Sequence, residues 1–135
     1  MGQTQILFIV LSVIIVGIAV AVGITQFGSN ATQANLSACE LDAQDLGSKM
    51  QLWLNKPTSL GGGGGAFTGV TCDLIGATDA DGDASQYTND NGVYKLASIS
   101  ATQATIQVFP KSSPSTEAMS FTVTASGVQK DATPQ

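Results

Sequence analysis

The chain has 135 residues, of which 43% are hydrophobic and 11% charged, and its net charge is −5 with no Arg and no His. Nucleic acids and anionic lipid surfaces are bound through clustered basic side chains, so this charge balance excludes both as partners. The absence of His removes the commonest general base and metal ligand, so we expect a protein that is not an enzyme.

The N-terminal part of the chain, residues 1–28, is dominated by an apolar run from Ile6 to Ile24. At about 1.5 Å per helical residue the run spans roughly 28 Å, close to the roughly 30 Å of bilayer hydrocarbon. The first charged residue is Glu40, so the run lacks the basic flanks that orient ordinary anchors and signal peptides. These features predict a helix of membrane-spanning length that lacks the basic flanks of an ordinary membrane anchor.

Helical periodicity continues beyond the apolar run, through residues 29–56. Apolar residues recur there in steps of three and four, which places them on one stripe of a helix: Leu36, Cys39, Ala43, Leu46, Met50 and Trp53. Pro57 ends the pattern. We therefore predict one N-terminal helix over 1–56, with an apolar membrane or filament-core part (1–28) and an amphipathic part (29–56).

A glycine-rich segment, residues 57–66, follows the helix. It contains five consecutive glycines, Gly61 to Gly65, which predict a flexible linker. The Lys-Ser/Thr pair that completes a phosphate-binding loop does not follow them, so that interpretation is rejected.

In residues 67–135 the period of the apolar residues changes to two, which is typical of β-strands. We predict four strands, at 67–74, 92–99, 103–109 and 118–126. The fold class that follows is α+β, in which the C-terminal half of the long helix packs on a four-stranded antiparallel sheet.

Cys39 lies on the apolar stripe of the helix, and Cys72 lies on the apolar face of the first predicted strand. We predict a disulfide between them, formed in an oxidising compartment. It would close a loop of about 34 residues, worth roughly 3–4 kcal/mol in the chain-entropy description. Two free buried thiols are the alternative.

An acidic loop carries Asp79, Asp81, Asp83 and Asp90. Clustered carboxylates of this kind bind hard cations, so calcium is the one cofactor that the sequence suggests. The glycine of the loop, Gly82, is not at the position that an EF-hand loop requires, and a solvated acidic loop is the alternative.

The order of these elements, with the opening segment MGQTQILFIV, resembles the type IV pilin superfamily. The resemblance implies that Met1 is the N-methylated first residue and that Gln5 occupies the place of the family's glutamate. Small residues such as Gly17 and Gly23 let neighbouring helices approach closely. Leu41 and Leu52 lie on the face of the helix opposite the stripe that packs on the sheet. The residues that we expect at the filament core are Met1, Gln5, Ile6, Phe8, Ile9, Gly17, Gly23, Leu41 and Leu52.

The resemblance implies a structural subunit of an extracellular type IV pilus-like filament. The subunit would be inserted in the inner membrane before assembly and would then form a helical homopolymer at the cell surface, where such fimbriae serve in cell adhesion. Two alternatives share the long helix. One is a pseudopilin of a type II secretion system, and the other is a single-pass membrane-anchored extracellular binding domain.

Overall fold

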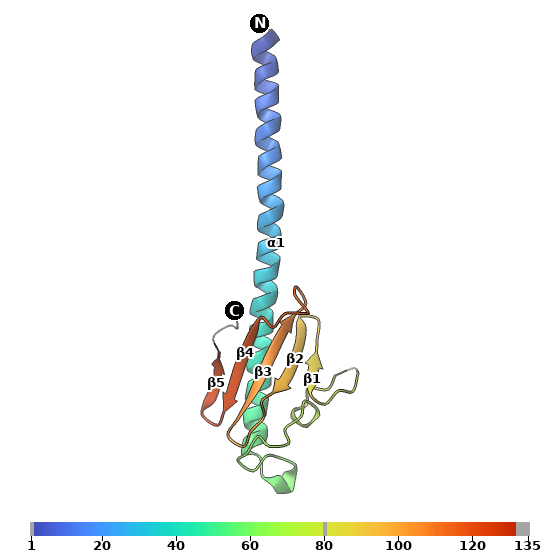
Figure 1. The fold of residues 1–135 in the computed structure, drawn as a ribbon, viewed down its shortest axis with the longest axis vertical. Helices are drawn as coiled ribbons and strands as arrows, with labels where there is room; N and C mark the ends of the chain where they lie inside the picture. The colour runs from blue at the N-terminus through green and yellow to red at the C-terminus, as the bar shows by residue number, and fades with distance from the viewer. Residues whose placement is uncertain (1, 80, 132–135) are drawn as a thin grey trace. The chain divides into compact units, whose positions relative to one another are not determined.

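The structure is a computed structural model that describes residues 2–79 and 81–131. It divides after Ala34 into an N-terminal helical unit and a C-terminal unit that begins at Asn35. Helix α1 (Gly2–Asn55) runs through both units, and Figure 1 shows its C-terminal part against the sheet. The remaining elements are the 3-10 turns η1 (Thr58–Leu60) and η2 (Asp73–Ile75) and the strands β1 (Gln86–Thr88), β2 (Gly92–Ala97), β3 (Gln103–Pro110), β4 (Met119–Thr124) and β5 (Gly127–Lys130).

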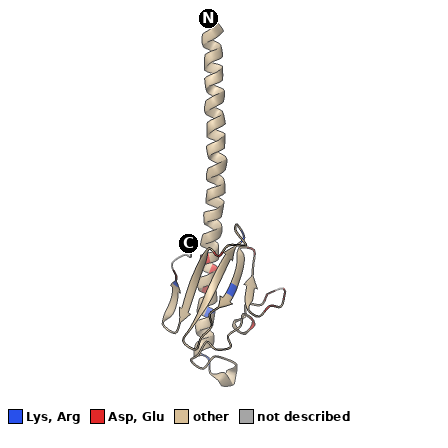
Figure 2. Ribbon diagram, in the orientation of Figure 1, with Lys and Arg blue, Asp and Glu red and all other residues tan. Residues whose placement is uncertain are grey.

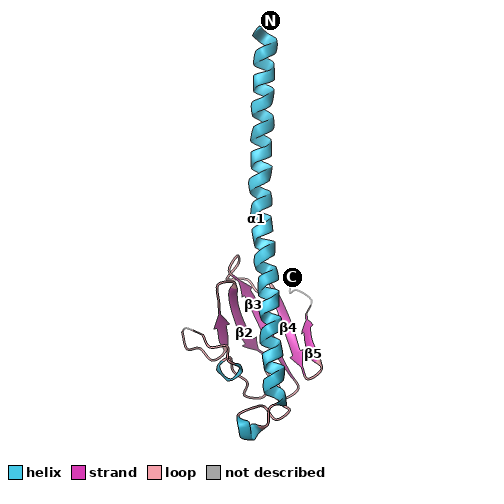
Figure 3. Ribbon diagram, turned by 180° about the vertical axis from the view of Figure 1, so that it is seen from behind, coloured by secondary structure: helices cyan, strands magenta, loops and turns pink. Residues whose placement is uncertain are grey.

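The α+β fold class is confirmed, with five strands instead of four. The sheet is antiparallel throughout, and its spatial order β1-β2-β3-β4-β5 follows the chain. Figure 3 shows the C-terminal part of α1 crossing one face of this sheet. Such a meander needs only short connections, which the turns at Asn91-Gly92 and Ala125-Ser126 supply.

The apolar stripe of α1 packs on the sheet as predicted. Leu36 is half-buried, and the other five members, from Cys39 to Trp53, are buried. Alternate residues of β3 and β4 complete the core from the sheet: Ala104, Ile106, Val108, Met119, Phe121 and Val123. Burying each large apolar side chain contributes about 1.5–3 kcal/mol, so the stripe holds the helix on the sheet.

Residues 67–74 do not form the first predicted strand. Gly69 and Gly76 have φ values of 85° and 74°, and Cys72 is in the right-handed helical region as the cap of η2. These angles interrupt an extended backbone. As a result Ile75 is buried in place of Leu74, which is exposed, while Val70 and Cys72 reach the core as expected.

Two short strands at the sheet edges, β1 and β5, were not predicted, and with the strand at 67–74 absent they bring the total to five. The three residues of β1 pair with β2, where Tyr87 stacks on Tyr94 with ring centroids 5.8 Å apart. The predicted strand 118–126 ends at Thr124, and the chain turns there into the four residues of β5. Strands this short carry too few residues for a clear alternation, and their pairing with a longer neighbour decides their conformation.

The five glycines, predicted as a flexible linker, form turns that hydrogen-bond to the end of α1. Backbone N–H groups of the run cap the C-terminal carbonyls of α1: Gly63 donates to Trp53 O at 2.9 Å and Gly65 to Leu54 O at 2.8 Å. Gly61, Gly64 and Gly65 have positive φ, a conformation that other residues adopt only at a cost. The glycines therefore satisfy the carbonyl groups that every helix end leaves unpaired.

Candidate assembly surfaces

The N-terminal unit exposes the whole apolar run. Its large apolar side chains from Ile6 to Ile24 are between 49% and 69% exposed, including Ile6, Phe8 and Ile9. An 18-residue window of the helix has a mean hydropathy of 3.1, and none of it is buried among the residues that the structure describes. Figure 2 shows this part of α1 without charged residues. An N-terminal helix of this kind indicates membrane insertion or secretion.

Two hydroxyl groups at the apolar run of this unit donate hydrogen bonds within the helix. Ser12 Oγ donates to Phe8 O at 2.7 Å, and Thr25 Oγ1 donates to Ala21 O at 3.0 Å. An unpaired polar group in hydrocarbon costs several kcal/mol, so these bonds let the unit enter an apolar environment. Around Gly17 and Gly23 there is open space for a neighbouring backbone. Gln5 is exposed, and Met1, the predicted methylation site, lies outside the described residues.

In the C-terminal unit, α1 carries a second exposed surface opposite the sheet. Leu41 is 67% and Leu52 is 72% exposed, although both lie on a helix whose other face is in the core. Asp45 lies one turn after Leu41 and forms an ion pair with Lys49 at 2.9 Å.

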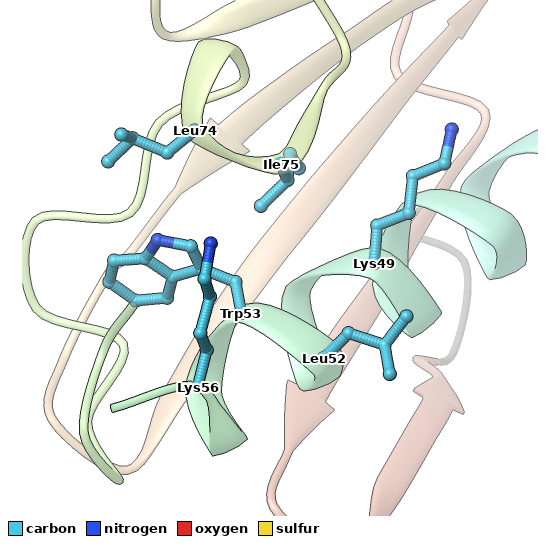
Figure 4. A pocket seen from close by; sticks show the side chains of 6 residues that line it. All are labelled: Lys49, Leu52, Trp53, Lys56, Leu74 and Ile75. Carbon is cyan, nitrogen blue, oxygen red and sulfur yellow. The ribbon is translucent and has the colours of Figure 1, made fainter. Parts of the chain in front are cut away.

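Beside Leu52 there is a shallow hollow of about 210 Å³. Figure 4 shows its lining, with three residues from α1, one that follows the helix end, and two from η2: Lys49, Leu52, Trp53, Lys56, Leu74 and Ile75. Trp53 forms the floor; it is buried, and its indole Nε1 donates to Gly61 O at 3.1 Å. The hollow thus combines an apolar floor with two cationic side chains at its rim.

A polar cluster joins α1 to the turn between β1 and β2. Asp42 Oδ2 accepts hydrogen bonds from Asn91 Nδ2 (2.7 Å), Asn89 Nδ2 (2.8 Å) and the Tyr94 hydroxyl (2.9 Å). Desolvation acts to raise the pKa of Asp42, but these three bonds and the charge of Lys49 together hold it below its usual value. One carboxylate therefore fixes the helix against the tip of a hairpin.

Sequence reasoning did not find this cluster, although a signal was present. Asp42 is a carboxylate three residues after Cys39, at the edge of the apolar stripe. Its partners lie about fifty residues later, Asn89 and Asn91 just before the predicted strand 92–99 and Tyr94 within it. Asn35 adds to the same contact, because its Nδ2 donates to Asn91 O at 2.9 Å.

The predicted disulfide is not formed. Cys39 and Cys72 are both free and buried, and Cys39 Sγ donates to Asn91 O at 3.3 Å. Burial raises the pKa of both thiols; that of Cys72 reaches about 11, where the nearby carboxylates, first among them Asp73, act in the same direction. The prediction placed Cys72 on an extended strand, whereas in the structure Cys72 caps the turn η2.

The predicted calcium site is not present among the described residues, where no three carboxylate or thiol side chains are grouped to hold an ion. Asp83 instead closes its own turn, accepting from Ser85 N at 2.9 Å and Ser85 Oγ at 2.7 Å, which lowers its pKa. Asp79 is buried and accepts from Thr88 Oγ1 at 3.3 Å. Asp81 and Asp90 are exposed. Two of the four carboxylates, those of Asp79 and Asp83, therefore serve in local hydrogen bonds.

The architecture is pilin-like: a long apolar N-terminal helix whose second half packs on an antiparallel sheet. In comparisons with known proteins, no protein-family model, no curated protein and no solved structure matches the chain.

Proposed function

We propose that this chain is a structural subunit of an extracellular pilus-like helical filament, held together by a core of N-terminal helices. The observation that carries the proposal is the exposure of every large apolar side chain from Ile6 to Ile24 on a helix that also forms part of a folded, acidic head. Water strongly disfavours so much apolar surface. Lipid covers it before assembly, and copies of the same helix cover it afterwards.

The second exposed surface supports assembly over simple anchoring. A single-pass anchor needs an apolar face only within the bilayer, whereas Leu41 and Leu52 lie on the part of α1 that carries the sheet. Isolated exposed leucines are common on proteins, but these two lie on one stripe of one helix. Neighbouring subunits would cover both residues in a filament.

Gln5 has a defined role in this proposal. A carboxylate within an apolar bundle is costly unless it is paired, and its pairing fixes the axial register. Gln5 offers hydrogen bonds without charge, so burying it costs less free energy than burying a carboxylate. It also constrains the axial register of neighbouring helices less strictly. We expect its amide to bond near the amino terminus of a neighbouring subunit, and a filament structure with Gln5 facing water would contradict this.

Electron microscopy of sheared cell-surface material tests the proposal, with Leu41→Asp as the decisive variant. The wild-type chain should give long filaments, and Leu41→Asp should reduce their amount at least tenfold, since it puts a charge into a subunit contact. The isolated Leu41→Asp subunit should keep its melting temperature within a few degrees, because Leu41 faces away from the core.

Ser113→Asp provides the matched control, since it adds the same charge to an exposed residue outside the stripe of Leu41 and Leu52 and should leave filaments intact. Normal filaments from Leu41→Asp would count against the proposal. A chain that stays monomeric after detergent extraction and never forms filaments would favour the membrane-anchored binding domain. Short assemblies confined to the periplasm would favour the pseudopilin.

A further inference from the structure

We propose that Asn91-Gly92 is a latent deamidation site, which the hydrogen bonds around Asp42 hold in an unreactive geometry. It is the only Asn-Gly pair in the sequence. Asparagine is most labile before glycine, because a residue without Cβ leaves its backbone nitrogen unhindered and its backbone free to turn. The inference concerns a covalent modification of the head and goes beyond the proposed filament.

Deamidation is an intramolecular attack followed by hydrolysis. The backbone nitrogen of Gly92 loses its proton to hydroxide and attacks Cγ of Asn91, so that a new C–N bond closes a succinimide ring. The side-chain nitrogen of Asn91 takes up a proton from water and leaves as ammonia. Water then opens the ring at either carbonyl group, which yields aspartate or isoaspartate. Water is consumed and ammonia is released, and no oxidant or cofactor is needed.

Both reacting groups are bound in the structure, and both sets of bonds lead to Asp42. The nitrogen that must leave, Asn91 Nδ2, donates to Asp42 Oδ2 at 2.7 Å. The nitrogen that must attack, Gly92 N, donates to Asn89 Oδ1 at 3.1 Å. Asn89 is itself held by Asp42, because its Nδ2 donates to Asp42 Oδ2 at 2.8 Å. One carboxylate on α1 therefore restrains the nucleophile and the electrophile together.

The charge of Asp42 opposes the reaction as well. Attack on Cγ places negative charge on the side-chain oxygen of Asn91, and the neighbouring carboxylate disfavours a like charge. The backbone of the pair is also fixed, because Asn91 O accepts from Asn35 Nδ2 at 2.9 Å and from Lys111 N at 2.9 Å. The reaction therefore requires the turn between β1 and β2 to leave α1 first.

Packing explains why the chain contains so labile a pair. A Cβ built on Gly92 would lie 2.4 Å from Phe109 O and 3.0 Å from Pro110 Cα, so another residue would force the backbone of β3 to shift. Asn91 supplies the side-chain donor for Asp42 and the carbonyl acceptor for α1. Each residue is required by its own contacts, and their adjacency creates the labile pair.

Deamidation makes the release of this turn irreversible. Aspartate at position 91 replaces the Nδ2 donor by an oxygen, so two carboxylates would meet where the 2.7 Å bond now lies. Isoaspartate also adds a methylene group to the backbone, which displaces the carbonyl oxygen of residue 91 from its donors. The head thus converts a long-lived opening of the contact with α1 into a permanent covalent change.

Mass spectrometry of the full-length chain in detergent measures the amide-to-acid change at Asn91 during incubation in mildly alkaline buffer. The folded wild-type chain should react about a hundredfold more slowly than the chain in guanidinium chloride, because only the open fraction reacts. Asp42→Ala should speed the reaction of the folded chain by about tenfold or more. Tyr94→Phe is the matched control: it removes another donor to Asp42, at 2.9 Å, but leaves both restraints in place, so the rate should change less than about threefold.

Two further variants keep the test independent of overall stability. Asn89→Ala frees only Gly92 N and should speed the reaction by about threefold or more, even if Asp42→Ala does not fold. Val123→Ala creates a cavity in the core at β4, away from the cluster. Compared with Asp42→Ala at denaturant concentrations that give equal global stability, Val123→Ala should deamidate Asn91 about tenfold more slowly.

Equal rates for the folded and the denatured wild-type chain would overturn the proposal, as would equal rates for Asp42→Ala and Val123→Ala. Asn91→Asp, which is the product itself, should lower the melting temperature by about 4 °C or more, whereas the same change at the exposed Asn30 should leave it unaltered. An unaltered melting temperature for Asn91→Asp would overturn the irreversible release. None of these measurements depends on filaments, so their failure would leave the proposed function in place.

Discussion

At the scale of single residues, Asp42 shows how one carboxylate can join two elements. It accepts three hydrogen bonds from the β1–β2 hairpin, through Asn89, Asn91 and Tyr94. Hydrogen bonds to a charged group are worth about 1.5–3 kcal/mol each, more than neutral ones. The cluster also raises the pKa of Tyr94, first through burial and then through its contacts with Cys39 and Asp42.

The depressed pKa of Asp42 predicts a loss of stability in acid. A carboxyl group whose pKa is lower in the folded than in the unfolded state stabilises the fold. Its contribution is complete at pH values above the unfolded-state pKa of about 4. This contribution is lost as the pH falls through the folded pKa. Asp42→Asn should therefore lower the free energy of unfolding by about 1 kcal/mol at pH 7 and flatten its decline below pH 5.

Urea titrations of both proteins across the acid range would measure this difference. Asp42→Ala is the stronger variant, because it leaves three donors without an acceptor and should cost about 3 kcal/mol. Asp45→Asn is the matched control: its carboxylate is exposed and forms only a surface ion pair, so the change should stay within about 0.5 kcal/mol. Equal effects of the Asp42 and Asp45 variants would contradict the role of the cluster.

At the scale of elements, Gly47 sets how closely α1 approaches the sheet. The sequence marks it as a weak point, because glycine in a helix interior costs about 1 kcal/mol relative to alanine. In the structure Gly47 is buried, and a Cβ built on it would lie 2.6 Å from a methyl group of Val128 in β5. The absent side chain is what lets the helix cross β4 and β5 at this distance.

Gly47→Ala should therefore destabilise the protein in spite of its better helix propensity. Overpacking of a close contact costs about 1–3 kcal/mol, which exceeds the propensity gain, so we expect a net loss of about 1 kcal/mol. Val128→Ala in the same chain should recover most of this loss, since it removes the methyl groups that clash. A double-mutant cycle measured by urea unfolding gives the coupling energy.

Ser48→Ala is the control for this cycle. Ser48 is the next residue of α1, is exposed, and should tolerate alanine without loss. If Gly47→Ala proved stabilising, or if Val128→Ala added its cost without coupling, the close approach at Gly47 would not be the constraint that we infer.

At the scale of the whole molecule, the two units depend on different surroundings. The buried core of the C-terminal unit contains residues from Cys39 to Val123, with Leu36 and Val128 packed against it, and draws on no described residue before Leu36. The N-terminal unit has no core of its own, and its apolar side chains are exposed to whatever surrounds it. We therefore expect folding of the head and burial of the apolar helix to be separate events.

A chain that begins at Ser29 should therefore remain folded and become a soluble monomer. Circular dichroism should show a single cooperative transition, and analytical ultracentrifugation should give the monomer mass at micromolar concentration. The full chain should instead require detergent, lipid or a filament, because it exposes the run from Ile6 to Ile24. A truncated chain that aggregates or lacks cooperative unfolding would show that the head depends on the N-terminal residues.

Much of this structure follows from pattern alone. The steps of three and four from Leu36 to Trp53 determined which face of α1 is buried. The charge-free run before Glu40 determined that exposure of the N-terminal unit to water is unfavourable. The alternation in 103–109 and 118–126 identified the two central strands. These signals are local and strong because burial of an entire helix stripe or strand face depends on the period of the sequence.

Tertiary structure decided what depends on pairs of distant residues. The turns at 67–76 follow from glycine φ angles and keep Cys72 from the strand position that the disulfide prediction assumed. The edge strands exist because β2 and β4 offer them backbone partners. The glycine run is ordered by carbonyl groups of α1, and the hollow at Leu52 and the Asp42 cluster arise only when segments twenty to fifty residues apart meet. A single sequence records the period of its elements, whereas contacts of this kind depend on how the packed elements are spaced.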